Sequence, residues 1–358
     1  MSRHVRPRPP ARPTEVTISS PGMGYRTFGR TGLQVSVCGL GGGGESRLGL
    51  KKGSTEEQAI GLVQRGLDLG ITYFDTAPNY GTEDVIGRAL QRHRADVVIS
   101  TKTVARREDG SLVGGTDVRR ALEASLRNLR TDVVDVYHVH RVRPEDYEHT
   151  VAEIVPELLA LRDEGKLRFL GISESTGGDA RHTMLCRAVE DDCWDVMMTG
   201  FTFFNQSARD LLFPAAIDKD MAVEIMASAR SYFSRPEQLA SEIGRLVDAG
   251  LVGRDAVDLT DPLGFLTRAG VPSLTEASYR FVAHEPGVHV VLVGTGNPAH
   301  LEENVRALSA GPLPAAVAEQ LTSLFGHLSM AVDAPWRQGP THDHNQHVPA
   351  TGRGEDQR

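Results

Sequence analysis

The chain has 358 residues, a formal net charge of −8 and 40% apolar residues, which is enough apolar material for one large core. The acidic balance argues against a nucleic-acid-binding protein. No apolar run approaches the roughly 20 residues that cross a bilayer. We therefore expect a globular protein without a nucleic-acid partner and without a membrane segment.

The two ends of the chain differ in composition from its centre. The first 13 residues hold four arginines, four prolines and no acidic residue, so we expect residues 1–24 to form a disordered basic arm rather than a targeting peptide. Residues 331–358 are rich in Pro, His, Gly and Gln, and we expect a disordered tail. His342, His344 and His347 in this tail have no supporting scaffold, so no metal site is expected.

The three cysteines, Cys38, Cys186 and Cys193, are widely spaced and form no CxxC pair. Such a set is typical of reduced thiols, because disulfides form mainly in oxidising compartments. The sequence therefore predicts a cytoplasmic location.

Residues 25–330 are expected to form one domain, which opens with a hairpin over residues 25–35. Eight short apolar runs follow, bounded by turn residues and separated by helix-length segments, which is the pattern of parallel βα units. The expected strands span residues 36–40, 71–74, 97–100, 133–139, 167–172, 195–199, 222–226 and 288–293. Doubly wound sheets alternate in the same way but seldom need eight regular units. The sequence therefore predicts an α/β fold, a (β/α)8 TIM barrel.

Helices are expected between these strands. Ser54 and Glu57 have the spacing of a capping box, and Thr116 is a candidate cap for a later helix. The expected helices span residues 54–69, 82–90, 116–129, 145–164 and 179–190, with another from 298 onward. Residues 227–272, between the seventh and eighth strands, exceed what a crossover needs, and we expect a long insertion over the barrel mouth, with a helix over 236–249.

Four residues suited to proton transfer follow the second, third and fourth expected strands. Asp75 and then Tyr80 come after the second strand, Lys102 after the third and His140 after the fourth. In a parallel barrel the carboxyl ends of all strands face one mouth, where catalytic groups gather. Each residue alone has a structural explanation, such as a turn cap or a solvated charge. Together they predict a site that protonates or deprotonates an oxygen.

The chemistry that this quartet could perform is carbonyl–alcohol interconversion. An ammonium beside a tyrosine favours the phenolate, so we expect Lys102 to lower the pKa of Tyr80, with Asp75 holding Lys102 charged. Tyr80 would then act as general acid for reduction and general base for oxidation. His140 would donate a hydrogen bond to the carbonyl oxygen. His138 would point to the same side of an ideal strand, which makes it the alternative if the register differs.

Two glycine-containing segments are candidates for binding phosphate. Residues 39–44 satisfy the GxGxxG pattern, but a polar loop separates them from the next helix, so we expect a flexible lip rather than a phosphate cradle. The better candidate follows the eighth strand, because its backbone amides continue into a helix whose N-terminus favours anions. This segment consists of Gly294, Thr295, Gly296 and Asn297.

Several segments, in this order, resemble the bacterial aldo/keto reductases. They are Tyr25 to Ser36, Phe74 to Gly81, Ser100 to Lys102, Asp135 to His140, Gly171 to Ser173, Gly294 to Thr295 and Glu303 to Asn304. The resemblance covers about Tyr25 to Leu324. It implies the (β/α)8 barrel reached above and a nicotinamide cofactor, usually NADPH.

The resemblance also implies positions for this cofactor. The loop from Gly294 would face its adenosine phosphate end, with Glu303 and Asn304 at the adenine. Arg230 and Ser231 would contact the pyrophosphate. His300 stands at the position of a family arginine and Gly296 at that of a frequent lysine, so NADH remains open as the cofactor.

The carboxamide end departs from the family pattern. Ser173 and Glu174 stand where the family usually has Ser-Asn, and Met198 where it usually has Gln. Ser173 would therefore carry most of the carboxamide recognition, with Glu174 limited to accepting a hydrogen bond.

The sequence thus predicts an NAD(P)-dependent oxidoreductase that interconverts an aldehyde or ketone and an alcohol, with a small carbonyl, alcohol or sugar-like substrate. Arg141 is a candidate to attract an anionic substrate. The alternative is a cofactor-binding regulatory or sensing barrel with little turnover, which the loss of the two family amides would favour. A barrel isomerase or lyase that uses Tyr80 and Lys102 without hydride transfer is a third possibility. The oligomeric state is not indicated.

Overall fold

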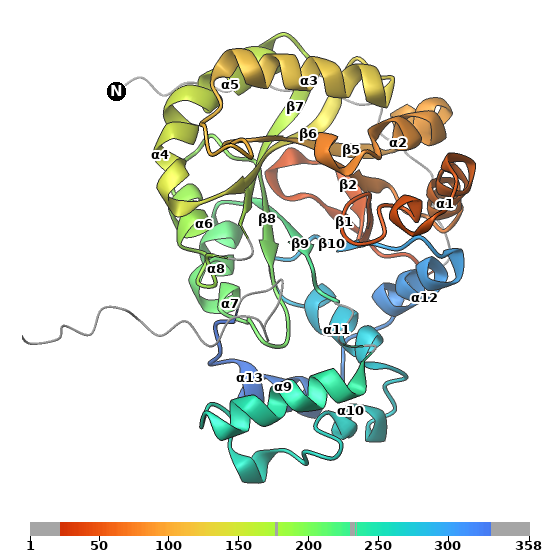
Figure 1. Cartoon of the computed structure of the whole chain (residues 1–358), viewed down its shortest axis with the longest axis vertical. Helices are drawn as coiled ribbons and strands as arrows, with labels where there is room; N and C mark the ends of the chain where they lie inside the picture. Colours follow the sequence, from red (N-terminus) through yellow and green to blue (C-terminus); the bar gives the residue numbers. More distant parts are fainter. Residues whose placement is uncertain (1–21, 176–177, 230–232, 234, 331–358) are drawn as a thin grey trace, which may run out of the picture.

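The computed structural model describes residues 22–175, 178–229, 233 and 235–330. Its centre is a closed barrel of eight parallel strands, surrounded by helices in Figure 1. The strands follow one another around the barrel in chain order, and the last pairs with the first. They span Cys38–Gly41 (β3), Tyr73–Asp75 (β4), Val98–Val104 (β5), Val134–Val142 (β6), Leu167–Glu174 (β7), Val196–Gly200 (β8), Ala222–Met226 (β9) and Val290–Val293 (β10). The predicted TIM barrel is confirmed.

The expected N-terminal hairpin is also confirmed. β1 (Tyr25–Thr27) and β2 (Gln34–Ser36) pair antiparallel. Hairpin side chains share one buried apolar cluster with side chains from the beginnings of the barrel strands. The cluster contains Phe28, Leu33, Val35, Tyr73, Val98, Val136, Phe169, Val196, Ala222 and Val290. The amino-terminal end of the barrel is thereby filled with apolar groups, which leaves the opposite end for polar ones.

The helices of the described residues lie mainly outside the barrel (Figure 1). They span Glu56–Asp68 (α1), Glu83–Leu90 (α2), Gly115–Leu129 (α3), Tyr147–His149 (α4), Val155–Asp163 (α5), Thr183–Ala188 (α6), Ala208–Leu211 (α7), Phe213–Asp218 (α8), Pro236–Asp248 (α9), Gly264–Arg268 (α10), Leu274–Ala283 (α11), Pro298–Ser309 (α12) and Ala315–Phe325 (α13). Within the described part of the chain, none is long and apolar enough to cross a membrane.

Two helix starts differ slightly from the prediction. Thr55, not Ser54, caps α1: its side chain accepts from the backbone of Gln58, whose side chain in turn accepts from the backbone of Thr55. α3 begins at Gly115, one residue before the expected Thr116. Neighbouring residues with similar capping ability compete for these positions, and the packing of each helix decides between them.

The helix expected over residues 145–164 is present over residues 147–163, but it is not a regular α-helix throughout. α4 continues into a π-helical turn, Thr150–Ile154, before α5 begins. Pro156 stands in the first turn of α5 and has no backbone N–H to donate to the preceding turn, so the regular hydrogen-bond ladder is interrupted there.

The helix expected over 179–190 is shorter than predicted. The carboxylate of Asp179 accepts from the backbone amides of Thr183 and Met184, each at 2.8 Å. Because these bonds satisfy the first free N–H groups of a helix, α6 begins beyond Asp179.

The insertion between β9 and β10 is present, and its helix α9 begins at the predicted residue. In Figure 1, α9 and α10 lie beside α13, at the opposite side of the molecule from β5 and β6. His327 is 2.6 Å from the backbone oxygen of Leu251, which joins the insertion to the end of the domain. The expected position of the insertion over the mouth stays a prediction, and residues 230–232 and 234 of the insertion lie outside the described residues. The expected tail, and all but positions 22–24 of the expected arm, lie outside the described residues.

Candidate active site

The four residues predicted to transfer protons meet at the carboxyl-terminal ends of three neighbouring strands. Asp75 ends β4, Lys102 lies in β5 and His140 lies in β6. Tyr80 ends a 3-10 turn, Pro78–Tyr80, shortly after β4. Because β4 pairs with β5 and β5 with β6, the strand order itself brings these side chains together.

Lys102 and Asp75 form a buried ion pair. The ammonium of Lys102 donates to Oδ1 of Asp75 and, at 2.8 Å, to the backbone oxygen of Thr76. Burial lowers the pKa of Lys102, but Asp75 and Tyr80 outweigh burial, so the pKa of Lys102 lies above its ordinary value. Burial raises the pKa of Asp75, against the opposing effect of Lys102. Lys102 is thus held as a cation in the barrel interior, where only 1% of its side chain is exposed.

Tyr80 stands between Lys102 and His140. Its hydroxyl oxygen is 3.2 Å from Nε2 of His140, and the two rings are nearly perpendicular, at 86°. The Lys102 ammonium lies over the face of the Tyr80 ring, 5.3 Å from its centre. Gly43, in the expected lip after β3, packs against this ring so closely that an added Cβ would lie 2.6 Å from Cε2 of Tyr80. The lip therefore holds the tyrosine in place.

The pKa of Tyr80 shifts in the direction opposite to our prediction. Burial raises the pKa of Tyr80, and the lowering effect of Lys102 only partly offsets it. The expectation of a pKa below the ordinary value is therefore wrong. The physical reason is that Tyr80 lies in the barrel mouth, where loss of water disfavours the phenolate more than the nearby cation favours it.

His140 is neutral in this site. Burial, and then the charge of Lys102, lower the pKa of His140 well below its ordinary value. The β6–β7 register shifts between Val139 and Val142, and Arg141 has a φ of 55°. Such a bulge re-aims the side chains beside it. The backbone N–H of Arg141 donates to the Ser173 hydroxyl at 2.9 Å, which holds the irregular stretch against β7.

A buried polar network beneath the quartet was largely missed from the sequence. The Ser100 hydroxyl donates to Asp75 at 3.0 Å and lies 3.1 Å from Nδ1 of His138. His138 points into the barrel, toward Glu224 of β9, and is not the residue beside Tyr80. Residues two apart on a strand point to the same face, so an inward-pointing Lys102 indicates that Ser100 also points into the barrel. An acid in the otherwise apolar strand β9 was the available sign for Glu224.

The loop after β10 has the form expected of an anion site. Asn297 caps α12 by accepting from the backbone of Ala299 at 3.0 Å, and the Thr295 hydroxyl accepts from the backbone of Asn297 at 3.0 Å. α12 begins with Pro298, and the positive end of its dipole faces the loop, with the amides of Ala299 and Leu301 bonded to Asn297. His300 and Glu303 are exposed and Asn304 half-buried, and their spacing places them on one side of this helix.

The lip loop after β3 crosses this β10 loop. A Cβ on Gly296 would lie 2.6 Å from the backbone nitrogen of Gly49, so no larger residue fits at position 296. This contact explains why a lysine is missing there. The same loop carries Arg47, whose Nε is buried and has no hydrogen-bond partner among the described residues.

The carboxamide candidates are only partly available. Ser173 is buried at the end of β7 beside the bulge. The Glu174 carboxylate already accepts from the Gly200 backbone at 2.9 Å and the Thr199 hydroxyl at 2.8 Å, and it pairs with His182. Because Glu174 is tied into this cluster, it is not free to turn toward a ligand. Arg230 lies outside the described residues.

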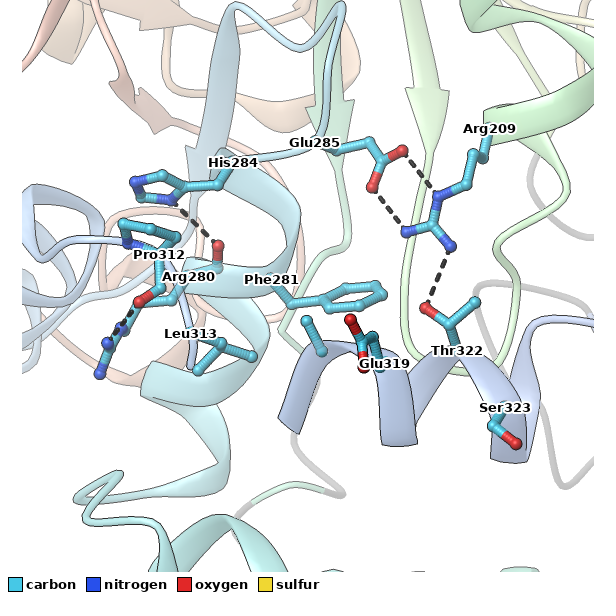
Figure 2. A pocket seen from close by; sticks show the side chains of 11 residues that line it. Arg209, Arg280, Phe281, His284, Glu285, Pro312, Leu313, Glu319, Thr322 and Ser323 are labelled. Atoms are coloured by element: carbon cyan, nitrogen blue, oxygen red, sulfur yellow. Dashed lines mark hydrogen bonds and ion pairs between the residues drawn. The ribbon is translucent and has the colours of Figure 1, made fainter. Parts of the chain in front are cut away.

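A hollow of about 530 Å³ between α11 and α13 lies away from the quartet. Figure 2 shows Arg209 bonded there to Glu285 and Thr322, and Arg280 bonded to the backbone of Pro312. Both guanidinium groups are thus satisfied within the protein. The hollow is a joint between helices rather than a ligand site.

The sequence profile of the Aldo/keto reductase family matches residues 39–325. An L-galactose dehydrogenase from Arabidopsis thaliana is 37% identical over 155 residues, which cover 41% of this chain and 47% of that protein. An uncharacterised oxidoreductase of Bacillus subtilis is 25% identical over 85% of this chain and 96% of its own.

Solved structures agree with the fold. The holo form of an aldo-keto reductase from Bacillus halodurans superposes with a TM-score of 0.64 at 23% identity, over 85% of this chain and 96% of that one. A putative aldo-keto reductase from Pseudomonas aeruginosa gives a TM-score of 0.57 at 25% identity, over 80% and 94% of the two chains. The chain belongs to the aldo/keto reductase family and is an NAD(P)-dependent oxidoreductase that interconverts carbonyl compounds and alcohols.

Proposed function

We propose that Tyr80 exchanges the proton in this reaction, with His140, Lys102 and Asp75 arranged around it. The observation that carries the proposal is the position of the Tyr80 hydroxyl, 3.2 Å from a neutral histidine, with a buried ammonium over the face of its ring. A hydroxyl at the open end of a barrel, held by both lip and strand, can reach a carbonyl oxygen that enters from solvent.

Tyr80, Lys102 and Asp75 have different roles in the reaction. When bound, the nicotinamide supplies a hydride to the carbonyl carbon. Tyr80 gives its proton to the carbonyl oxygen, and the C=O double bond becomes a C–OH group. The charge left on Tyr80 is stabilised by Lys102, an interaction that grows only as the proton leaves. Asp75 keeps Lys102 charged and in position. In oxidation the same tyrosine accepts the proton from the alcohol.

His140 lies within hydrogen-bond distance of the Tyr80 hydroxyl and would donate to the incoming carbonyl oxygen. A neutral imidazole can take this role without adding a second cation beside Lys102. A second cation there would disfavour the charged form of Lys102. The structure thus supports a site that is charged on one side of the tyrosine and neutral on the other.

The residues present fit a nicotinamide dinucleotide best at its phosphate end. The amino end of α12 with the loop from Gly294 would hold phosphate, and Ser173 would hold the carboxamide. Arg47, two residues before Gly49 in the same loop, offers a buried donor without a partner among the described residues, and its charge also acts on Tyr80. We assign to Arg47 the role of the lysine that cannot fit at position 296, and we expect NADPH to be the preferred cofactor, with NADH accepted more weakly.

Arg47→Gln should therefore weaken NADPH binding by about tenfold, which corresponds to about 1.4 kcal/mol, and weaken NADH binding less. Fluorescence titration of the protein with each cofactor measures this directly. Arg92→Gln removes the same charge from an exposed arginine remote from the mouth and should leave both dissociation constants unchanged. Equal dissociation constants for wild type and Arg47→Gln would contradict the assignment.

For the substrate we propose a small aldehyde, ketone or sugar-like compound, with the partial similarity to an L-galactose dehydrogenase as support for the sugar-like class. We further propose that residues 25–330 act as one unit in the cytoplasm. Cofactor titration followed by a panel of carbonyl compounds and aldoses tests the proposal. Tight cofactor binding with no turnover of any compound would instead favour the sensing alternative, which none of the named relatives supports.

A further inference from the structure

The polar network beneath the quartet crosses the whole barrel interior. From β4 and β5 it contains Tyr73, Asp75, Ser100 and Lys102; from β6 it contains His138, and from β9 Glu224. His138 and Glu224 are both 0% exposed. A buried carboxylate without pairing is costly, so the presence of Glu224 in the core of the barrel calls for a physical role.

The hydrogen bonds fix which ring nitrogen of His138 carries a proton. The Ser100 hydroxyl has one hydrogen, and it is donated to Asp75. Toward His138, 3.1 Å away, the Ser100 oxygen can therefore only accept, so Nδ1 of His138 must be protonated. The other ring nitrogen, Nε2, faces Glu224, which holds the ring from the opposite side.

Glu224 lies on the far side of the His138 ring. Its Oε1 is 3.3 Å from Nε2 of His138, close enough for an ion pair though not aligned as a hydrogen bond, and it also accepts from the Tyr73 hydroxyl.

Gly171 makes the arrangement possible. A Cβ at this position of β7 would lie 2.6 Å from Nε2 of His138, so any larger residue would push the ring out of the barrel. The charge of Glu224 reaches the quartet, since it contributes to raising the pKa of both Asp75 and Lys102.

We propose that Glu224 and His138 are positioning residues, which through Ser100 hold the Asp75 carboxylate in the geometry that keeps Lys102 beneath Tyr80. The inference rests on the proposed role of Tyr80 and Lys102. Its core is the direction of one chain of hydrogen bonds: His138 donates to Ser100, and Ser100 donates to Asp75. If the His138 tautomer changed, Ser100 would donate to Nδ1 instead, and Asp75 would lose a donor.

Glu224→Met keeps the approximate volume but removes the carboxylate that faces Nε2, so the His138 ring should shift away from Ser100. We expect kcat to fall by about tenfold, less than the roughly 100-fold that a 1 Å misplacement can cost, with KM and the cofactor Kd unchanged. Glu224→Gln can still accept from the Tyr73 hydroxyl and fill the space beside Nε2, and it should retain most of kcat. Nitrogen NMR of the labelled protein should show the Nδ1–H of His138 hydrogen-bonded in wild type and Glu224→Gln, and this hydrogen bond lost in Glu224→Met.

Ser100→Ala supplies a second route to the same test that does not depend on the folding of Glu224→Met. It should lower kcat by a similar factor, and the Ser100→Ala/Glu224→Met double variant should be no slower than either single variant. Glu83→Met is the matched control. Glu83 is a buried carboxylate bonded to Thr101 and Asn128, outside this network, and its loss should lower stability while leaving kcat near wild type.

A wild-type kcat in folded Glu224→Met or in Ser100→Ala would overturn the proposal. So would losses that multiply in the double variant, or an equal kcat loss in Glu83→Met. The NMR measurement needs no turnover, so it separates this inference from the proposed function. An unprotonated Nδ1 of His138 in the wild type contradicts the positioning chain, whereas failure of the wild type to reduce any carbonyl contradicts the role of Tyr80.

Discussion

Tyr80→Phe should lower kcat for carbonyl reduction by about 10²- to 10⁴-fold, the usual contribution of a positioned general acid, while the cofactor Kd stays within about twofold. The reason is that the substitution removes only the hydroxyl. The ring remains packed against Gly43 and under the Lys102 ammonium, so the mouth keeps its shape. Steady-state turnover and cofactor fluorescence on the same preparation measure the two quantities.

Tyr137→Phe is the matched control for this substitution. Tyr137 lies in β6 next to His138, and its buried hydroxyl contacts Thr103 and no residue of the quartet. Removing this hydroxyl should leave kcat unchanged and cost at most about 1 kcal/mol of stability. If Tyr80→Phe kept most of the turnover, or if both variants lost it equally, another residue would be the proton donor.

Single substitutions of the ion pair should destabilise the fold as well as abolish turnover. Lys102→Met leaves the buried Asp75 carboxylate without its partner, and Asp75→Asn does the same to the ammonium. Breaking one side of a buried pair costs about 3–5 kcal/mol, so each variant should unfold at a much lower denaturant concentration. Turnover should fall by at least 10²-fold in each, because Lys102 no longer stabilises the charge on Tyr80.

The double variant Asp75→Asn/Lys102→Met separates the two effects. With both charges gone, its free energy of unfolding should recover toward wild type, although its turnover should stay lost. Denaturant unfolding of the four proteins gives the coupling energy between the two residues. Strictly additive losses of stability would mean that the pair is not coupled, and recovery of turnover in the double variant would mean that Lys102 has no part in the chemistry.

The fold and the quartet could be predicted because both follow from local patterns. The runs before Asp75, Lys102 and His140 are apolar and short, and parallel strands place their carboxyl ends at one mouth. Because these strands are neighbours in the barrel in the same order as in the chain, their side chains meet. No long-range information beyond the closure of the barrel was needed.

What could not be predicted depends on packing between distant segments. The pKa direction of Tyr80 was wrong because burial is a property of the whole mouth, not of the spacing to Lys102. The missing lysine at position 296 became explicable only from the approach of Gly49, far away in sequence. Likewise, only the hydrogen bonds that Glu174 accepts from Thr199 and Gly200 show that its carboxylate is not available to a ligand.

Glu224 illustrates the same limit. A single acidic residue in an apolar strand does not indicate which residue it contacts, and its neighbour in the structure, His138, lies 86 residues earlier in the chain. The two meet only because β6 and β9 face each other across the interior, over the space that Gly171 leaves open. The strand pattern predicts which residues point inward, whereas only the closed barrel shows which inward residues touch.

The pH dependence of hydride transfer in a single turnover tests most directly whether a protonated Tyr80 supplies the proton. His140 is already neutral, and burial holds the pKa of Tyr80 above its ordinary value of about 10. The rate of carbonyl reduction should therefore be constant through neutral pH and fall only as pH rises past about 10, when the hydroxyl loses its proton. A midpoint near about 6.5, the ordinary value for histidine, or a loss complete by about pH 8 would contradict this assignment of the acid.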